Sequence, residues 1–180
     1  MKELQGSSQL ALDNRIISDR VQTWIPLPED REDYGRLRAP GLEVTGRDLN
    51  TFSTPVRGKL TVVESGKDIP FQIVRIFYIY GATTDCERGA HAHRATWQSF
   101  IAVSGSFVLE LTDGHFQNTY LLENASRVIN VPPMIWARLY GFSKDAVCLV
   151  LASSLYDSAD YIREWEDYLA LVRSDSTRTR

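Results

Sequence analysis

Residues 97–111 read WQSFIAVSGSFVLEL, and this stretch indicates most clearly how the chain folds. Apolar runs with an alternating pattern lie on both sides of Ser104-Gly105, which is typical of two short strands joined by a turn. Further short runs extend to Ser153, separated by turn signals such as Asp113-Gly114 and Pro132-Pro133. Short strands at this spacing predict an all-β fold, an antiparallel barrel or jelly roll.

The two ends of the chain have a different character. The segment that opens with Ser158 begins with a capping residue, and its apolar side chains up to Val172 recur at helical spacing, which predicts one C-terminal helix packed on the barrel. Residues 1–50 are polar and interrupted by proline. We therefore expect an N-terminal extension over residues 1–50, acting as a dimer arm or a lid, and one globular domain over residues 51–180.

Composition narrows the function classes. Apolar residues make up 43% of the 180 residues, enough for a packed core, and the formal net charge of -3 argues against a nucleic-acid-binding protein. The two cysteines suggest no disulfide framework. The N-terminus lacks an apolar signal core and no stretch approaches membrane-spanning length, so we expect a cytoplasmic protein without a membrane partner.

The best clue to chemistry is the sequence RGAHAH at residues 88–93. Side chains two residues apart in a strand point to the same face, so His91 and His93 are expected to project side by side. The chain contains 3 histidines in total, and two of them stand in this motif. Three interpretations compete: hydrogen-bonded polar residues of the barrel, metal ligands, or a metal-free acid/base pair.

A metal site needs more ligands than two imidazoles. Further ligands usually stand about four residues after the second histidine and on a later strand that follows a proline-rich turn. Here the first position holds Trp97-Gln98, and the second, after Pro132-Pro133, holds Trp136-Ala137-Arg138. Neither group offers a carboxylate or an imidazole. We therefore favour acid/base chemistry without a metal or cofactor, in which one imidazole removes a proton and its neighbour orients it or binds the substrate.

Several motifs occur in an order that points to a family. Residues from about 55 to 172 resemble the sugar-nucleotide 3,4-ketoisomerases of the cupin superfamily, grouped as WxcM-like proteins. The matching segments are Arg57–Leu60, Ile69–Phe71, Arg75–Tyr80, Arg88–His93, Val103–Ser106, Asp113-Gly114, Pro133–Trp136, Val150–Ser153, Tyr156-Asp157 and Asp160–Arg163.

This resemblance implies an RmlC-like cupin jelly roll and a homodimer that exchanges N-terminal strands. It also implies a reaction that moves the keto group of a thymidine-diphosphate (dTDP)-linked 4-keto-6-deoxyhexose from C4 to C3 through an enediol, in deoxysugar and surface-glycan biosynthesis such as that of lipopolysaccharide O-antigen. By similarity His91 is the base, with His93 beside it, and Tyr78 donates a hydrogen bond to the developing oxyanion or shuttles a proton.

Substrate-binding residues follow from the same resemblance and from side-chain chemistry. The diphosphate requires arginine, and Arg88 and Arg75 match family positions, with Arg57 as a weaker candidate. Gln98 lies five residues after His93, on the opposite strand parity, so we expect it to point away from the pair and to play a small role. The remaining candidates are two large aromatic residues that line the barrel mouth or pack in its core, Trp97 and Trp136.

Two departures from the family pattern keep other functions open. Many relatives carry Glu in place of Trp97 and His in place of Ala137. The alternatives are a non-catalytic sugar-nucleotide-binding cupin, and a 3,5-epimerase, which the motif order disfavours. The stereochemistry of the product at C4 is not encoded in any recognisable pattern.

Overall fold

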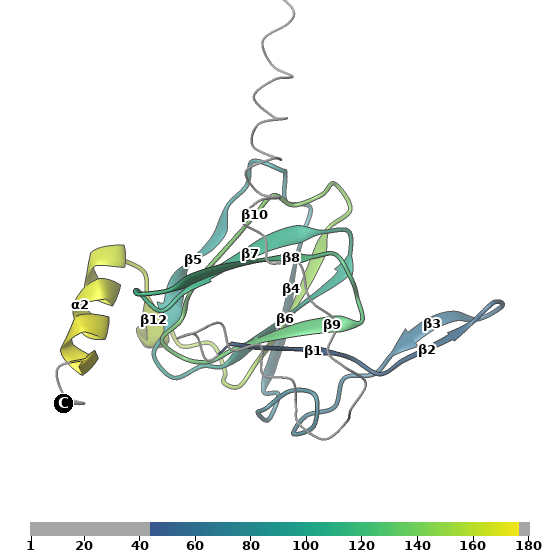
Figure 1. Ribbon diagram of the computed structural model, residues 1–180, viewed down its shortest axis with the longest axis horizontal. Coiled ribbons are helices and arrows are strands. Elements are labelled where there is room, and N and C mark those ends of the chain that lie inside the picture. Colours follow the sequence, from purple (N-terminus) through teal and green to yellow (C-terminus); the bar gives the residue numbers. More distant parts are fainter. Residues whose placement is uncertain (1–43, 177–180) are drawn as a thin grey trace, which may run out of the picture.

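Two antiparallel five-stranded sheets face each other in the computed structural model, which describes residues 44–176 (Figure 1). The first sheet has the order β1 (Thr45–Asp48), β9 (Arg127–Val131), β6 (Gln98–Ser104), β11 (Val147–Ala152) and β4 (Arg75–Tyr80). The second has the order β12 (Tyr161–Ile162), β5 (Arg88–His93), β10 (Trp136–Tyr140), β7 (Phe107–Thr112) and β8 (Gln117–Leu122). The predicted jelly-roll barrel is confirmed.

The hydrophobic core lies between the sheets because alternate residues of each strand point inward. Phe100 and Ala102 of β6 meet Leu109 and Leu111 of β7 in this core, and all four are nearly inaccessible to solvent. A second, smaller cluster covers part of the outer face of the first sheet and contains Ile69, which is fully buried. Inward and outward residues of a strand can therefore be told apart by the cluster they join.

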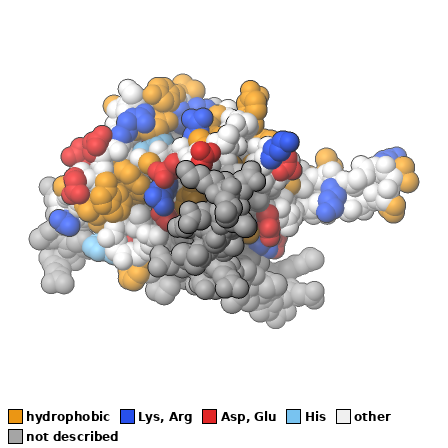
Figure 2. All heavy atoms as spheres, turned by 90° about the horizontal axis from the view of Figure 1, so that it is seen from above, with side chains coloured by type: hydrophobic (Ala, Val, Ile, Leu, Met, Phe, Trp, Pro, Cys, Tyr) orange, Lys and Arg blue, Asp and Glu red, His pale blue; other side chains and the backbone are white. Residues whose placement is uncertain are grey.

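A hairpin of β2 (Thr51–Thr54) and β3 (Gly58–Thr61) projects from the barrel on the side away from the C-terminal helix (Figure 1). Hydrophobic side chains lie along it with 55% of Phe52, 95% of Val56 and 62% of Leu60 exposed. Figure 2 shows hydrophobic and cationic side chains on this projecting segment. The hairpin thus exposes apolar surface that the rest of the described chain leaves uncovered.

The C-terminal segment differs from the single helix predicted from Ser158. A short 3-10 helix spans Ser158–Asp160, with the side chain of Asp157 as its N-cap, and β12 follows before helix α2 begins at Trp165 and runs to Ser176. The helical prediction failed at its start because Tyr161 and Ile162 pair with β5, and this tertiary pairing overrides the local pattern. Helix α2 packs on the outer face of the second sheet through Tyr168, which is fully buried.

The barrel begins before residue 51, since β1 pairs with β9 along its whole length. The rest of the expected extension lies outside the described residues, and its role as an arm or lid stays a prediction. None of the helices in the described part of the chain is long and apolar enough to cross a membrane.

Candidate active site

Strand β5 carries both imidazoles and contains a bulge. Gly89 is opposite Arg138 of β10, whereas His91 is opposite Ala137, so Ala90 is the extra residue. Gly89 and Ala90 both have positive φ, of 78° and 52°. A positive φ is unfavourable for alanine, and strained backbone of this kind is concentrated at functional sites. After the bulge His91 shares the inward face with Ala137, which belongs to the barrel core.

His91 is held through its Nδ1, which lies 2.8 Å from the carbonyl oxygen of Gly89. A carbonyl only accepts hydrogen bonds, so Nδ1 carries the proton and Nε2 keeps its lone pair when the ring is neutral. Burial lowers the pKa of His91, the hydrogen bond to Gly89 opposes this, and the nearby His93 and Arg163 lower it further. His91 is therefore a neutral imidazole with a free basic nitrogen at neutral pH.

His93 is held by a carboxylate instead of a carbonyl. Its Nδ1 lies 2.7 Å from Oδ2 of Asp160, and only 5% of the His93 side chain is exposed. Burial lowers the pKa of His93 against the hydrogen bond and charge of Asp160, which raise it. The rings of His91 and His93 meet edge to face with centroids 5.1 Å apart, side by side as the strand period predicted.

Aromatic and cationic side chains surround the pair. The ring of Tyr161 lies 4.8 Å from His91 and 4.3 Å from His93, measured between centroids, and the guanidinium of Arg163 stacks on it at 4.3 Å. Tyr156 links this group to Arg75, since its ring lies 5.5 Å from that of Tyr161 and 5.8 Å from the Arg75 guanidinium. The site thus combines basic nitrogens, fixed positive charge and flat stacking surfaces.

Two buried polar atoms of the site have no hydrogen-bond partner within the described structure: Nε2 of His93 and Nε of Arg75. A buried polar atom without a partner costs free energy, so such atoms mark places where a ligand or water completes the bonding. Arg75 also contributes to the electrostatic environment of His93. These two atoms come from opposite sheets, Arg75 from β4 and His93 from β5.

Two predicted site residues lie away from the imidazoles. Tyr78 has 62% of its surface exposed on the outer face of the first sheet, because its neighbours Phe77 and Ile79 occupy the inward positions of β4. Tyr78 therefore faces away from the imidazoles of its own chain, and its contact with the reacting oxygen stays a prediction. Arg57 sits in the turn of the projecting β2–β3 hairpin, where its backbone NH bonds the Thr54 hydroxyl, and does not approach His91 in the same chain.

Both tryptophans face outward and Gln98 faces inward, opposite to expectation. Trp97 packs near Phe71 with ring centroids 6.3 Å apart, and Trp136 packs 5.1 Å from the ring of Trp165 in helix α2. Neither lines the barrel interior. Gln98, by contrast, shares the inward parity of Phe100, since residues 94–97 form a loop between β5 and β6 and the alternation does not continue across it.

Arg88 lies exposed at the first position of β5, opposite Leu139. Residues that the sequence analysis did not single out for a role are Thr96, Tyr156, Asp160, Tyr161 and Arg163. The last three stand in the family motif at residues 160–163, so the resemblance contained the signal. Reading this segment as helix concealed that it pairs with the strand of the imidazoles.

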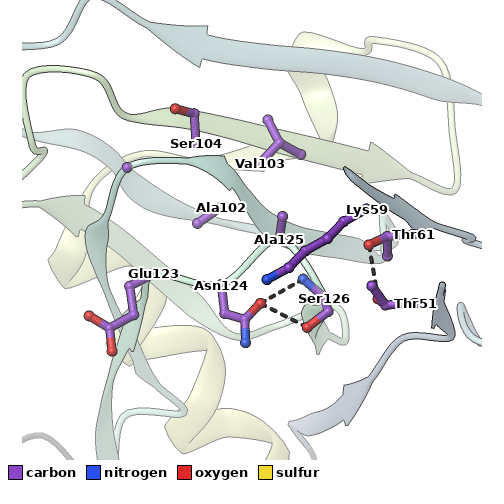
Figure 3. A pocket seen from close by; sticks show the side chains of 11 residues that line it. Thr51, Lys59, Thr61, Ala102, Val103, Ser104, Glu123, Asn124, Ala125 and Ser126 are labelled. Carbon is purple, nitrogen blue, oxygen red and sulfur yellow. Dashed lines mark hydrogen bonds between the residues drawn. The ribbon is translucent and has the colours of Figure 1, made fainter. Parts of the chain in front are cut away.

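A pocket of about 390 Å³ lies elsewhere, between the base of the hairpin and the β6–β7 and β8–β9 turns (Figure 3). Figure 3 shows Lys59 reaching over it toward Asn124 and Ser126. None of the predicted site residues lines this pocket. Within residues 44–176 no group of three or more His, Cys, Asp or Glu side chains is placed to hold a metal ion. The metal-free chemistry itself stays a prediction.

Comparisons with known proteins identify the family of this chain. Residues 43–173 match the family model described as WxcM-like, C-terminal. The chain is 37% identical over 112 residues to a TDP-4-oxo-6-deoxy-alpha-D-glucose-3,4-oxoisomerase of Aneurinibacillus thermoaerophilus, covering 62% of this chain and 81% of the relative.

Two solved structures share the fold closely. A 3,4-ketoisomerase from Helicobacter canadensis has a TM-score of 0.71 at 33% identity, covering 73% of this chain and 98% of that one. A mutant 3,4-ketoisomerase from Thermoanaerobacterium thermosaccharolyticum, in complex with TDP-4-keto-6-deoxyglucose, has a TM-score of 0.70 at 30% identity, with 73% and 94% covered. The chain therefore belongs to the WxcM-like family of cupin-fold sugar-nucleotide 3,4-ketoisomerases.

Proposed function

We propose that this protein moves the keto group of a TDP-linked 4-keto-6-deoxyhexose from C4 to C3. The observation that carries the proposal is the pair of adjacent imidazoles on β5, with His93 buried and His91 half-buried, each fixed through Nδ1 so that its Nε2 is available for chemistry. The reaction needs one proton removed from C3 and one delivered to C4, and imidazole accepts and donates protons near neutral pH. The names of the relatives support this substrate class.

In this proposal His91 is the base. Its lowered pKa keeps the ring neutral at pH 7, and the bond to Gly89 leaves the Nε2 lone pair to take the C3 proton. His91, protonated at Nε2 by this step, then returns a proton at C4. The buried Nε2 of His93, which lacks a partner in the described structure, accepts a hydrogen bond from a hydroxyl of the enediol. With Tyr78 on the outer face, Tyr161 is the phenol nearest to both imidazoles and takes over its expected role.

The diphosphate is assigned to arginines near the open end of β5. Arg88 and Arg163 are exposed there, and guanidinium groups bind phosphate oxygens in a planar, two-pronged geometry. Arg75 lies deeper, beside His93, and suits an oxygen of the sugar or the nearer phosphate. Tyr156 offers a flat exposed ring on which the thymine of the nucleotide can stack, with 63% of its surface accessible.

The proposed assembly is a homodimer that exchanges the β2–β3 hairpin. The hairpin exposes Phe52, Val56 and Leu60, while β4, the last strand of the first sheet in the described part of the chain, exposes Ile76 and Tyr80. Apolar surface of this extent is typical of an interface. The exchanged hairpin would carry Arg57 toward the partner, which accounts for its distance from the imidazoles of its own chain.

A charge in the hairpin tests the dimer. Leu60→Asp should convert the protein to a monomer in size-exclusion chromatography with light scattering, because an interface cannot bury an unpaired carboxylate cheaply. Leu121→Asp, at a residue 42% exposed on the other sheet, is the control and should remain dimeric. A wild-type monomer would contradict the proposed dimer and would leave the proposed reaction unaffected.

We further propose a cytoplasmic location and a role in surface-glycan synthesis, such as that of lipopolysaccharide O-antigen.

The reaction is tested by proton NMR of the purified protein with TDP-4-keto-6-deoxyglucose in heavy water, without added metal. A 3-keto product with deuterium at C4 is expected. His91→Asn should retain nucleotide binding and lose hydrogen exchange at C3. Exchange at C5 would indicate an epimerase instead, binding without any exchange would indicate a non-catalytic protein, and loss of activity with a chelator would contradict the metal-free form.

A further inference from the structure

Asp160 is bound on every side. Its Oδ1 accepts the backbone NH of Ala95 at 2.7 Å, and its Oδ2 accepts both the Thr96 hydroxyl at 2.5 Å and Nδ1 of His93 at 2.7 Å. Its backbone carbonyl accepts the NH of Arg94 at 2.8 Å. Only 13% of its side chain is exposed. The carboxylate therefore ties the loop after β5 to the imidazole that the same strand carries.

Resting on the proposed isomerase activity, we infer that Asp160 is a positioning residue, which holds His93 in a single tautomer and ring orientation with Nε2 facing the barrel interior. A carboxylate only accepts hydrogen bonds, so Nδ1 of His93 must carry a proton where it meets Asp160, as the NH of Ala95 and the hydroxyl of Thr96 do. Nε2, on the other side of the ring, is left as the nitrogen for the substrate, and it is buried and without a partner in the described structure.

The local structure fixes Asp160 before any substrate binds. It ends the 3-10 helix Ser158–Asp160, whose N-cap Asp157 accepts the NH of Ala159 at 2.9 Å. Tyr161, the next residue, pairs with His93 across β12 and β5. The Thr96 hydroxyl also lies 2.5 Å from that of Ser154, which anchors the network to the end of β11. A hydrogen-bonded network in a buried site restricts side-chain motion strongly.

The variant Asp160→Asn separates tautomer control from simple packing. An amide has the carboxylate's shape but one acceptor oxygen only. If that oxygen keeps the NH of Ala95, the NH₂ group faces Nδ1 of His93 and drives the ring proton to Nε2. The opposite orientation sets two donors against each other at Ala95 and is disfavoured. The expected result is a histidine of the wrong tautomer in an unchanged fold.

The effect on pH dependence follows from the charges around His93, which are Asp160, Arg75, Arg163 and the neighbouring His91. Asp160 is the one anion among them. Its removal leaves His93 facing cations and a second imidazole, so the pKa of His93 should fall. The pH profile of kcat should change shape, whereas a merely structural loss would scale it uniformly.

The test uses ¹⁵N-histidine NMR at about pH 8, where the buried rings are neutral. Exposed His115 gives a reference signal. In the wild type, His93 should show its proton on Nδ1, and in Asp160→Asn on Nε2, with His91 unchanged. The kcat should fall about 100-fold or more with little change in KM. Asp157→Asn, in the same segment but without contact to His93, should match the wild type in both measurements.

Each outcome decides. A wild-type His93 protonated on Nε2 overturns the inference, and this reading stands even if Asp160→Asn does not fold. A tautomer change with wild-type kcat also overturns it, because the orientation of His93 would then be irrelevant to turnover. Absence of any turnover by the wild type refutes the proposed function instead, and leaves the tautomer result as a statement about the resting protein.

Discussion

Replacing Gly89 with alanine tests whether the β5 bulge orients the base. A Cβ at this position would lie 2.7 Å from the backbone oxygen of Ala137 and 3.1 Å from Cδ1 of Leu139. Real Cβ atoms do not approach backbone this closely, so β5 and β10 must separate. The Gly89 carbonyl, which holds Nδ1 of His91, moves with them.

The size of the effect has two parts. A residue with a side chain at φ +78° costs about 1 kcal/mol relative to glycine. Separating the strands weakens at least one ladder hydrogen bond, worth a further ~1 kcal/mol. The loss of stability should total about 2 kcal/mol, and displacement of the base by a fraction of an ångström to an ångström should lower kcat/KM by about 10- to 100-fold.

Gly66→Ala is the matched control. Gly66 has the same φ of +78°, but a Cβ there would meet nothing within 4 Å, so it isolates the backbone cost. Urea unfolding followed by circular dichroism gives the stabilities, and the C3 exchange assay gives the activities. If Gly89→Ala and Gly66→Ala lose the same stability and keep the same activity, the bulge does not position His91 and the reasoning is wrong.

Three further predictions follow from the described contacts. Tyr78→Phe should keep kcat within about twofold of wild type, because the phenol faces away from the imidazoles; a large loss in the exchange assay would return Tyr78 to the site. Burial holds the pKa of His91 and His93 below 6.5, so the acid limb of the kcat/KM profile should have its midpoint below that value. The free energy of unfolding, measured in urea, should keep its full contribution from these neutral rings above pH 6.5. It should fall as the pH drops through the folded-state pKa values. Tyr168→Phe should cost about 1–2 kcal/mol in the same unfolding assay, since its hydroxyl lies 2.9 and 3.0 Å from two backbone carbonyls beneath helix α2, and an unchanged midpoint would contradict the role of that contact.

Local periodicity was sufficient for the barrel and for the imidazole pair. The apolar runs at residues 98–103 and 106–111 became β6 and β7 with small shifts at their ends. His91 and His93 share a face because the two-residue period of a strand acts within β5 itself. Such features depend on neighbours in sequence, which is why they were predictable.

The errors arose where a side chain's direction depends on distant partners. Tyr78 and Gln98 were assigned to faces by resemblance or by counting through a loop, whereas sheet pairing put Tyr78 outside and Gln98 inside. Asp160 approaches His93 across 67 residues of sequence, and no local pattern encodes that hydrogen bond. Trp136 points outward because its ring packs against Trp165 of helix α2. The sequence alone did not show on which face of the barrel this helix packs.

Strand β5 also constrains how this protein can diverge. Ala92 is fully inaccessible where it packs with Trp136, Ile162 and Tyr168 beneath α2, so any bulkier residue there would push the helix off the sheet. Selection for new sugar preferences, in nature or in a mutant library, is therefore free to alter the inward positions of the barrel and its mouth, while the reverse side of the same strand tolerates almost no change.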